Sequence, residues 1–232
     1  IWEYYKENLK GYKMSSLLLN NFNDFYKYYF KTDHHWNPVG AYKGYEDIAR
    51  MMGITPLKPA GKIKSGIKYM GSRAAKTAST DIKDDFTPYY FNFPKFSVSV
   101  KYKSDKTYKN LEKQYGEICL KEYGAQEIYV NNWQEIYDKT KKKPYFNHYW
   151  SYYGAGHPKL GVIKNLENKN KKNLLIIGSS MDNPLIKPLA SHFQNTYTID
   201  LREDNAVFDI KQFIEEHKIT DFLYNCAGAE VI

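Results

Sequence analysis

Three consecutive residues near the start of the chain, Asp33-His34-His35, carry side chains that can do acid–base chemistry, and Trp36 follows them directly. An aspartate can orient a histidine and stabilise its charged form, and the histidine can then deprotonate a nucleophile. Taken alone, the pattern allows either imidazole to be that base. A metal site is the competing hypothesis, but adjacent histidines project in different directions, and no further group of His, Asp or Glu has the spacing of metal ligands. We therefore expect acid–base chemistry without a metal.

The nucleophile that such a base needs is offered by Gly178-Ser179-Ser180. This turn follows an apolar run, 174–177, of the kind found in a strand covered on both faces, and it precedes a helical pattern over 182–194. A serine at this junction has its hydroxyl at the carboxyl edge of the sheet and its backbone N–H at a helix N-terminus, which stabilises a developing oxyanion. The alternatives are that Ser179 or Ser180 only caps the helix or binds a phosphate.

Asn225 is the third candidate for the same site. It comes directly after the last expected strand, 221–224, and therefore at the same edge of the sheet as Ser180. An amide at this place can donate a hydrogen bond to an oxyanion. Alternatively, Asn225 only forms the turn before Cys226-Ala227-Gly228.

The last third of the chain predicts the sheet that would carry Ser180 and Asn225. Hydrophobic patterns there alternate between those of strands and those of helices. The expected strands are 174–177, 196–201 and 221–224, and the expected helices are 182–194 and 209–217. This β-α-β-α-β order is typical of a parallel sheet with helical crossovers, so the expected fold class is α/β.

The Asp/His stretch lies between two further elements. Residues 25–30 are mostly aromatic and predict a strand. Asn37 as the N-cap, Pro38 at the first helical position and Gly53 at the end predict a helix. The stretch would then lie at a strand-to-helix junction, where open α/β folds tend to keep their chemistry.

The middle of the chain, residues 54–147, has a different pattern. It predicts short strands around 63–69, 89–91 and 96–100, and short helices around 107–115 and 132–140. We expect this segment to be an α+β insertion between the Asp/His block and the serine block. The whole chain, residues 1–232, is expected to form a single catalytic domain, which its length permits.

The composition narrows the functional classes. The chain has 232 residues, of which 42% are hydrophobic, and a net charge of +8. Its lysines are scattered apart from 141–143 and 171–172, without a nucleic-acid-binding motif, so we expect no nucleic-acid partner. No apolar run has the length of a membrane span, and membrane contact is expected only through an N-terminal segment preceding Ile1. The two cysteines, Cys119 and Cys226, neither require nor exclude a disulfide.

Two blocks of the sequence resemble a known family. The stretch from Phe30 to Tyr42 resembles the defining motif of the DHHW protein family, which is similar to the alginate O-acetyltransferase group with its Asp-x-His-Trp motif. Residues 173–183 resemble the strand of that family that ends in a Gly/Lys-Asp-Ser-Tyr turn. The resemblance covers roughly residues 25–53 and 148–225.

The resemblance implies an SGNH-hydrolase-like three-layer fold with circularly permuted catalytic blocks, the Asp/His block coming first. Carried over by position, Asp33 orients His35, His35 is the general base and Ser180 is the nucleophile. His35 is preferred over His34 because the related motif has one residue between its aspartate and its histidine. Asn225 matches the strand-end asparagine of SGNH enzymes and would join the N–H of Ser180 in an oxyanion hole.

Other residues are assigned to the site with less detail. Arg202, Tyr153 and Gly154 are expected to line the substrate-binding pocket. Two positions differ from the family pattern, because Ser179 stands where the family has an aspartate and Met181 where it has a tyrosine.

The function that the resemblance implies is serine-dependent acetyl transfer on a cell-surface or extracellular polysaccharide, through an acyl-Ser180 intermediate. A glycan acceptor and an acyl donor would be the partners, no cofactor is expected, and the location would be extracytoplasmic. One alternative is a carbohydrate esterase or deacetylase with the same site. The other is a non-catalytic glycan-binding or assembly module, which the changes at Ser179 and Met181 leave open.

Overall fold

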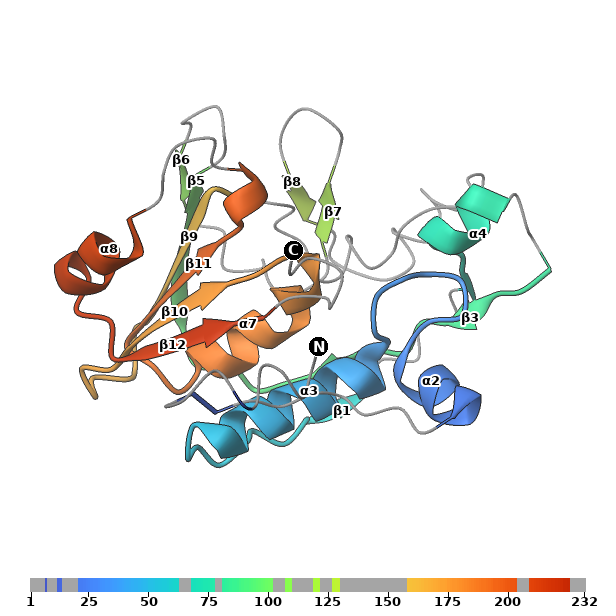
Figure 1. Cartoon of the computed structure of the whole chain (residues 1–232), viewed down its shortest axis with the longest axis horizontal. Helices are drawn as coiled ribbons and strands as arrows, with labels where there is room; N and C mark the ends of the chain where they lie inside the picture. The colour runs from blue at the N-terminus through green and yellow to red at the C-terminus, as the bar shows by residue number, and fades with distance from the viewer. Residues whose placement is uncertain are drawn as a thin grey trace.

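A computed structural model gives the architecture, and it describes residues 7, 12–13, 21–62, 68–77, 81–101, 107–109, 119–121, 127–129, 158–203 and 209–225. Its centre is a six-stranded sheet with the strand order β12-β10-β11-β9-β5-β6 (Figure 1). These strands are β5 Phe96–Lys101, β6 Thr107–Lys109, β9 Leu160–Asn165, β10 Asn173–Ile177, β11 Asn195–Ile199 and β12 Asp221–Tyr224.

The remaining elements surround this sheet. The helices are α2 Phe22–Tyr28, α3 Pro38–Met51, α4 Ser72–Thr77, α7 Asn183–Ala190 and α8 Ile210–Glu216, with single 3₁₀ turns at η1 Ser180–Asp182 and η2 Leu201–Glu203. Short strands form the pairs β1–β4, β2–β3 and β7–β8. Their bounds are β1 Gly61–Lys62, β2 Lys68–Tyr69, β3 Asp84–Asp85, β4 Tyr89–Tyr90, β7 Cys119–Lys121 and β8 Glu127–Tyr129.

The predicted α/β class is confirmed. Strand β10 runs parallel to both β11 and β12, and the two crossovers between them contain α7 and α8, as the β-α-β-α-β pattern predicts. The parallel part of the sheet consists of these three strands. Strands β9, β5 and β6 extend it in antiparallel pairing. The carboxyl ends of β10 and β12 lie side by side, since Ile177 pairs with Tyr224.

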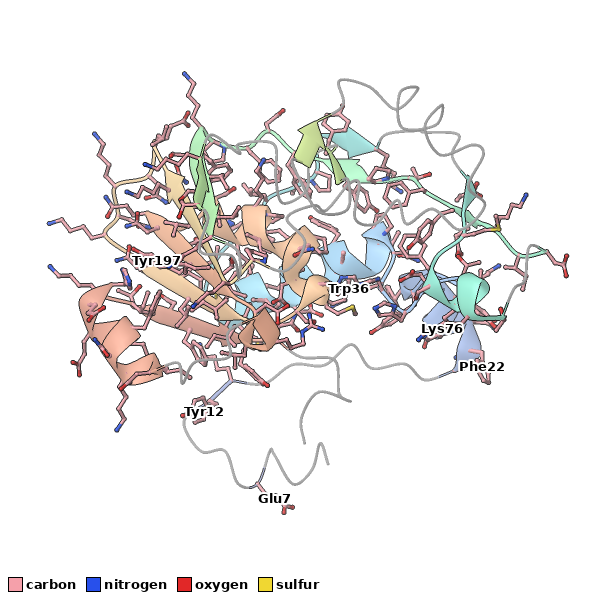
Figure 2. The ribbon with its side chains drawn as sticks, turned by 90° about the horizontal axis from the view of Figure 1, so that it is seen from above. Glu7, Tyr12, Phe22, Trp36, Lys76 and Tyr197 are labelled. Carbon is pink, nitrogen blue, oxygen red and sulfur yellow. The ribbon has the colours of Figure 1, made fainter. Side chains whose placement is uncertain are left out.

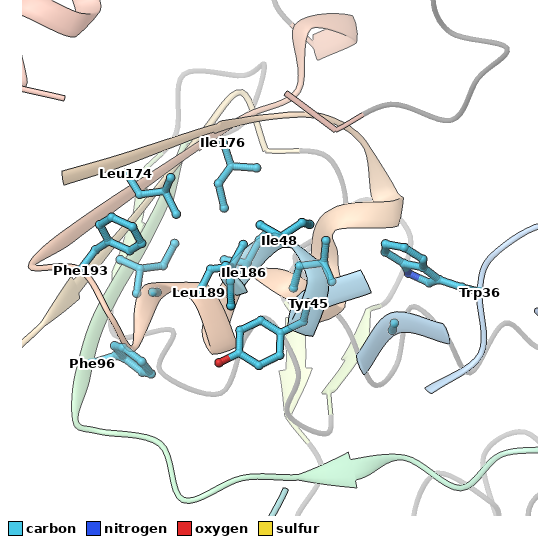
Figure 3. Close-up of a cluster of buried hydrophobic side chains, with 14 of the residues drawn as sticks. Trp36, Tyr45, Ile48, Phe96, Leu174, Ile176, Ile186, Leu189 and Phe193 are labelled. Atoms are coloured by element: carbon cyan, nitrogen blue, oxygen red, sulfur yellow. The ribbon is translucent and has the colours of Figure 1, made fainter. Parts of the chain in front are cut away.

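Helices cover both faces of the parallel strands, which gives three layers. On one face, Leu174 and Ile176 belong to the main hydrophobic cluster with residues of α3 and α7, part of which is drawn in Figure 3. On the other face, Leu175 and Ile177 pack with Phe213 and its neighbours in α8. Every residue of β10 is buried, because successive side chains of a strand point to opposite faces and both faces are covered.

The strand predicted for residues 25–30 is wrong, because this segment contains helix α2. Asn21 caps the helix, and its side-chain oxygen accepts hydrogen bonds from the N–H groups of Asn23 and Asp24. The rings of Phe25 and Tyr29 are four residues apart and stack at 5.0 Å, which is a helical spacing. The Asp/His stretch therefore lies in a loop between two helices.

The structure describes only part of the segment 54–147. Two strands of that part, β5 and β6, belong to the main sheet. Strand β5 pairs with β9 along its whole length, and β6 pairs with β5. The helix predicted for 107–115 is wrong at its start, which is strand β6, and the one predicted for 132–140 lies outside the described residues. That the chain is a single domain with an insertion stays a prediction. Within the described residues, no helix has the length and apolar character needed to cross a membrane.

Asn37 connects the site loop to both flanking helices, and we predict a large stability loss on its replacement by alanine. Its side-chain oxygen accepts from the N–H groups of Val39 and Gly40, and its amide donates to the carbonyl oxygens of Lys27 and Tyr29. Losing the cap costs about 1 kcal/mol, and losing the amide bonds costs about 1 kcal/mol more. Urea unfolding should therefore show a loss of about 2 kcal/mol.

Two further variants separate these contributions. Asn37→Asp keeps the capping oxygen but not the amide donors, so about half of the loss should remain. Asn21→Ala removes an exposed cap without the additional amide bonds, and it should cost about 1 kcal/mol or less. Equal losses in Asn37→Ala and Asn21→Ala would contradict the connecting role of Asn37.

Candidate active site

The Asp/His loop is closed by backbone contacts between its two ends. Tyr29 and Trp36 form an isolated antiparallel bridge, and the N–H of Asn37 donates to the carbonyl oxygen of Tyr28 at 2.8 Å. Trp36 is buried and packs with residues of α3 in the main hydrophobic cluster. Its ring lies over Gly44, where a Cβ atom would come within 2.7 Å of the indole. The loop thus has a fixed shape, which directs its side chains toward the end of the sheet.

Asp33 and His35 form a tightly bonded pair inside this loop. Nδ1 of His35 lies 2.5 Å from Oδ1 of Asp33, and the backbone N–H of His35 donates to the same oxygen at 2.9 Å. Their exposed fractions are 0% for Asp33 and 1% for His35. Because a carboxylate only accepts hydrogen bonds, this contact places the ring proton on Nδ1 and leaves Nε2 as a hydrogen-bond acceptor.

Ser180 meets this pair from the other end of the chain. Oγ of Ser180 lies 2.8 Å from Nε2 of His35, although the two residues are 145 positions apart. Ser180 is the first residue of η1, directly after the turn that ends β10. The structure therefore places Asp33, His35 and Ser180 in one continuous line of hydrogen bonds, which is the geometry of a nucleophile, its base and the group that orients the base.

Gly71 and Ser72 complete the surroundings of Asp33, and the sequence reasoning missed both. The N–H of Ser72 donates to Oδ2 of Asp33 at 2.8 Å. This approach is close, since a Cβ atom at Gly71 would lie 2.0 Å from that same oxygen. The only signal in the sequence is a Gly-Ser dipeptide, which is too common to indicate a site.

A second buried carboxylate, Asp84 in β3, anchors the loop. The sequence analysis did not identify this residue either. It accepts hydrogen bonds from the N–H groups of Lys31 and Thr32 and from the hydroxyl of Thr32. The hydroxyl oxygen of Thr32 in turn accepts from the N–H of Gly71 at 3.2 Å. The loop, the segment before α4 and strand β3 are therefore held together by polar contacts next to the site.

His34 occupies a different environment from His35. Its side chain is 56% exposed, and its Nδ1 lies 2.8 Å from the hydroxyl oxygen of Ser72. Its ring lies against that of His35, with centroids 3.9 Å apart. Of the two histidines, His35 is the one whose ring contacts Ser180, which agrees with the preference for His35 as the base.

The charge state of Asp33 follows from these contacts. Burial alone raises the pKa of Asp33, but the hydrogen bond and charge of His35 and the N–H groups of Ser72 and His35 lower it by more. The resulting pKa lies well below the ordinary value of an aspartate. The carboxylate is therefore ionised at neutral pH and can stabilise a protonated imidazole beside it.

The other residues of the serine turn support its shape. Ser179 is the N-cap of η1, and its hydroxyl oxygen accepts from the N–H of Met181 at 3.5 Å. The capping alternative considered for Ser179 or Ser180 thus applies to Ser179. Asn225 lies at the end of β12 as predicted, and its amide donates to the buried carboxylate of Asp182.

Of the three residues expected to line the substrate-binding pocket, the structure describes one, Arg202. Arg202 makes a bidentate contact with Asp200, whose carboxylate is buried. Asp200 lines a small pocket beside the serine turn, together with Ser179, Asp182 and Thr198. Tyr153 and Gly154 lie outside the described residues.

The Asp/His loop also contains the one group of potential metal ligands in the described part of the chain. The ligand atoms of Asp33, His34 and His35 lie within 4.8 Å of one another. However, Asp33 and His35 bond to each other, Nε2 of His35 faces Ser180, and Nδ1 of His34 faces Ser72. A metal bound through these atoms would have to replace those hydrogen bonds, so the arrangement fits acid–base chemistry better than metal binding.

Comparisons with known proteins agree with this fold. The sequence matches no family model, and no curated protein matches it either. The structure is similar to that of a DHHW family protein from Eubacterium siraeum, with a TM-score of 0.60 and 20% identity over 86% of this chain and 59% of that one. It is also similar to Bacillus cereus PatB1 in a structure with a sulfonyl adduct, with a TM-score of 0.61 and 22% identity over 98% of this chain and 66% of that one.

A second PatB1 structure gives a TM-score of 0.59 and 21% identity, over 98% of this chain and 67% of that one. These neighbours confirm the α/β SGNH-like fold. The chain spans 59% of the length of the first neighbour and 66–67% of PatB1. At these identities the likeness concerns the fold, and the roles of individual residues in catalysis stay predictions.

Gly71→Ala should disturb the Asp33 carboxylate directly, because the added methyl group has no room beside Oδ2. In the wild-type protein we expect a far-downfield proton resonance from the short His35–Asp33 hydrogen bond, and in Gly71→Ala we expect it to shift or disappear. The free energy of unfolding should fall by about 1–3 kcal/mol, as is usual for overpacking. In the matched variant Gly53→Ala, nothing lies within 4 Å of the added methyl group, but the φ angle of +73° is strained. Gly53→Ala should lose stability and keep the resonance. An unchanged resonance in Gly71→Ala would contradict the close contact between Gly71 and the Asp33 carboxylate.

The lowered pKa of Asp33 predicts a specific acid sensitivity. Its stabilising contribution is fully present above the unfolded-state pKa of about 4 and is lost as the pH falls toward the lower folded-state value. In Asp33→Asn, the slope of unfolding free energy against pH below pH 4 should be smaller by up to about 1.4 kcal/mol per pH unit. Urea unfolding at several pH values measures the slope, and Asp81→Asn at an exposed site is the control. Parallel slopes in Asp33→Asn and wild type would refute the assignment.

Proposed function

We propose that this protein is a serine-dependent acyl-transferring enzyme in which Ser180 is the nucleophile, His35 the general base and Asp33 the residue that orients it. One observation carries the proposal. Asp33, His35 and Ser180 are linked by contacts of 2.5 and 2.8 Å, with each imidazole nitrogen facing the partner that its role requires. The similarity to DHHW-type proteins in both motif and fold supports the same assignment.

The mechanism has two half-reactions. In the first, the oxygen of Ser180 attacks the carbonyl carbon of an ester while its proton passes to Nε2 of His35. The leaving alcohol takes that proton, and an acyl group remains on Ser180. In the second, an acceptor hydroxyl gives its proton to His35 and attacks the acyl carbon, the bond from that carbon to Ser180 breaks, and the serine oxygen takes the proton from His35. Asp33 stabilises the imidazolium in both steps because its carboxylate is ionised and faces Nδ1.

The oxyanion of each tetrahedral intermediate needs hydrogen-bond donors near Ser180. We assign this role to the backbone N–H of Ser180, at the start of η1, and to the amide of Asn225. The position of Asn225 at the end of β12, next to β10, supports the assignment. The carboxylate of Asp182 fixes the orientation of this amide, and one of its two N–H groups remains for the oxyanion.

The acyl group and the acceptor are assigned from the family resemblance. We propose acetyl transfer onto a cell-surface or extracellular polysaccharide, outside the cytoplasm, with Arg202 near the binding pocket. A deacetylating esterase would use the same acyl-Ser180 intermediate and differ in letting water attack it. The intact line of hydrogen bonds favours an enzyme over a non-catalytic module, and Ser179 keeps the turn capped although it is not an aspartate.

Ser180→Ala tests the proposal directly. Wild-type protein incubated with 4-nitrophenyl acetate should release nitrophenolate in a burst, and mass spectrometry should find the acetyl group on Ser180. The variant should lose turnover by about 10⁴-fold or more. An aryl sulfonyl fluoride should label the wild-type serine and not the variant, a reagent suggested by the sulfonyl adduct of PatB1.

Ser191→Ala is the matched control, since this serine lies at the far end of α7 and bonds to the carbonyl oxygen of Lys187. It should keep turnover and labelling. Retained turnover or labelling in Ser180→Ala would exclude Ser180 as the nucleophile.

A further inference from the structure

His34 is the outer, solvent-exposed member of the histidine pair. Its ring covers that of His35 at a centroid distance of 3.9 Å, and it is half-exposed while His35 and Ser180 are buried. Any molecule that reaches Ser180 past this pair therefore meets His34 first. The reaction proposed above gives His34 no role, although its ring lies directly against that of the proposed base, His35.

The contacts of His34 favour one position for its ring proton. Nδ1 lies 2.8 Å from the hydroxyl of Ser72 and 3.4 Å from Oδ1 of Asp33. A nearby carboxylate favours a proton on Nδ1, because the carboxylate can only accept. Nε2 of neutral His34 then carries a lone pair, and it contacts no polar group in the described part of the chain.

The charges around His34 keep this lone pair available. Burial lowers the pKa of His34 first, the charge of His35 lowers it further, and Arg73 and Lys76 in α4 add to the effect against the opposing charge of Asp33. Figure 2 places Lys76 on the α4 side of the loop that contains Trp36, away from Tyr197 in the sheet. His34 therefore stays neutral to a lower pH than a free histidine, and its Nε2 accepts hydrogen bonds rather than donating them.

We propose that His34 is the residue that binds the acyl acceptor, and that Nε2 of His34 accepts a hydrogen bond from a second hydroxyl of a polyol whose first hydroxyl reacts at His35. The two rings are tilted by 38° with their centroids 3.9 Å apart, and both Nδ1 atoms face Oδ1 of Asp33. Their Nε2 atoms therefore both point away from Asp33, which suits a polyol that engages both rings through two of its hydroxyls. The reacting hydroxyl gives its proton to Nε2 of His35 and forms the new C–O bond. The bond between the acyl carbon and Ser180 breaks, and that proton returns to the serine oxygen.

This inference rests on the proposed acyl-Ser180 chemistry and deepens it. It predicts that His34 determines whether the acyl group goes to a sugar-like acceptor or to water. A purely structural role of His34, such as supporting the ring of His35, would instead affect both half-reactions equally. The ratio of transfer to hydrolysis distinguishes the two roles.

The experiment uses the full chain with 4-nitrophenyl acetate as donor and glycerol, methyl glucoside or 1-propanol as acceptor. Acetylated acceptor and free acetate are both quantified. In the wild-type protein, transfer to glycerol and methyl glucoside should exceed transfer to 1-propanol. His34→Ala should lower the transfer-to-hydrolysis ratio for the two polyols about tenfold, as expected for one lost hydrogen bond. The ratio for 1-propanol should change little, and the burst should fall less than polyol transfer does.

Two variants serve as comparisons. His34→Gln keeps a side-chain oxygen that can accept a hydrogen bond, and it should recover part of the ratio. His217→Ala removes a histidine that packs on Tyr197 and Phe213, on the α8 side of the sheet, and it should leave the ratio unchanged. Acidification should lower the polyol ratio in the wild-type protein, as His34 becomes protonated, and should not do so in His34→Ala.

Each outcome decides the matter. Equal losses of burst and polyol transfer in His34→Ala, or no transfer to either polyol by the wild-type protein, would overturn the role of His34 and leave the acyl-enzyme intact. A wild-type protein without a burst, or a burst that survives in Ser180→Ala, would overturn the proposed function itself. Labelling of Ser180 by an aryl sulfonyl fluoride shows that each variant is folded at the site.

Discussion

The whole site depends on one buried carboxylate. Asp33 has no exposed surface, and three hydrogen bonds reach its oxygens, two from His35 and one from the backbone of Ser72. An ionised carboxylate outside water is costly unless its lone pairs are satisfied. The fold must therefore bring both His35, from the loop, and Ser72, at the start of α4, to the same side chain. The direction in which His35 faces Ser180 is a consequence of that requirement.

The site is assembled from three segments that are distant in sequence. The Asp/His loop comes first, and the serine turn after β10 comes last. Between them, Gly71, Ser72 and Asp84 fix the loop from its other side. Part of the segment that was expected to be an insertion thus supports Asp33 and Thr32. The same segment supplies β5 and β6 to the main sheet, so it takes part in both the scaffold and the site.

The features that could be predicted from the sequence are those with local causes. The cap at Asn37, the buried run of β10 and the turn at Ser180 each depend on residues within a few positions. The aromatic residues before the loop fit a strand or a helix equally well, and the cap at Asn21 decided for the helix. Ser72 and Asp84 could not be found, because their partners in the loop are 39 and 52 residues away and no local pattern marks them.

The adjacency of the two histidines is itself a structural constraint. In a strand, consecutive side chains would point to opposite faces, whereas this loop turns both rings to one side, where they overlap. The inner ring is then enclosed by Asp33, Ser180 and its own neighbour, His34. Enclosure lowers the local dielectric constant, which strengthens the bond between His35 and Asp33. The outer ring stays half-exposed because it covers the inner one. One loop therefore supplies both a buried imidazole, which is the proposed base, and an exposed imidazole beside it, and the two rings could not lie on the same side if the residues belonged to a strand.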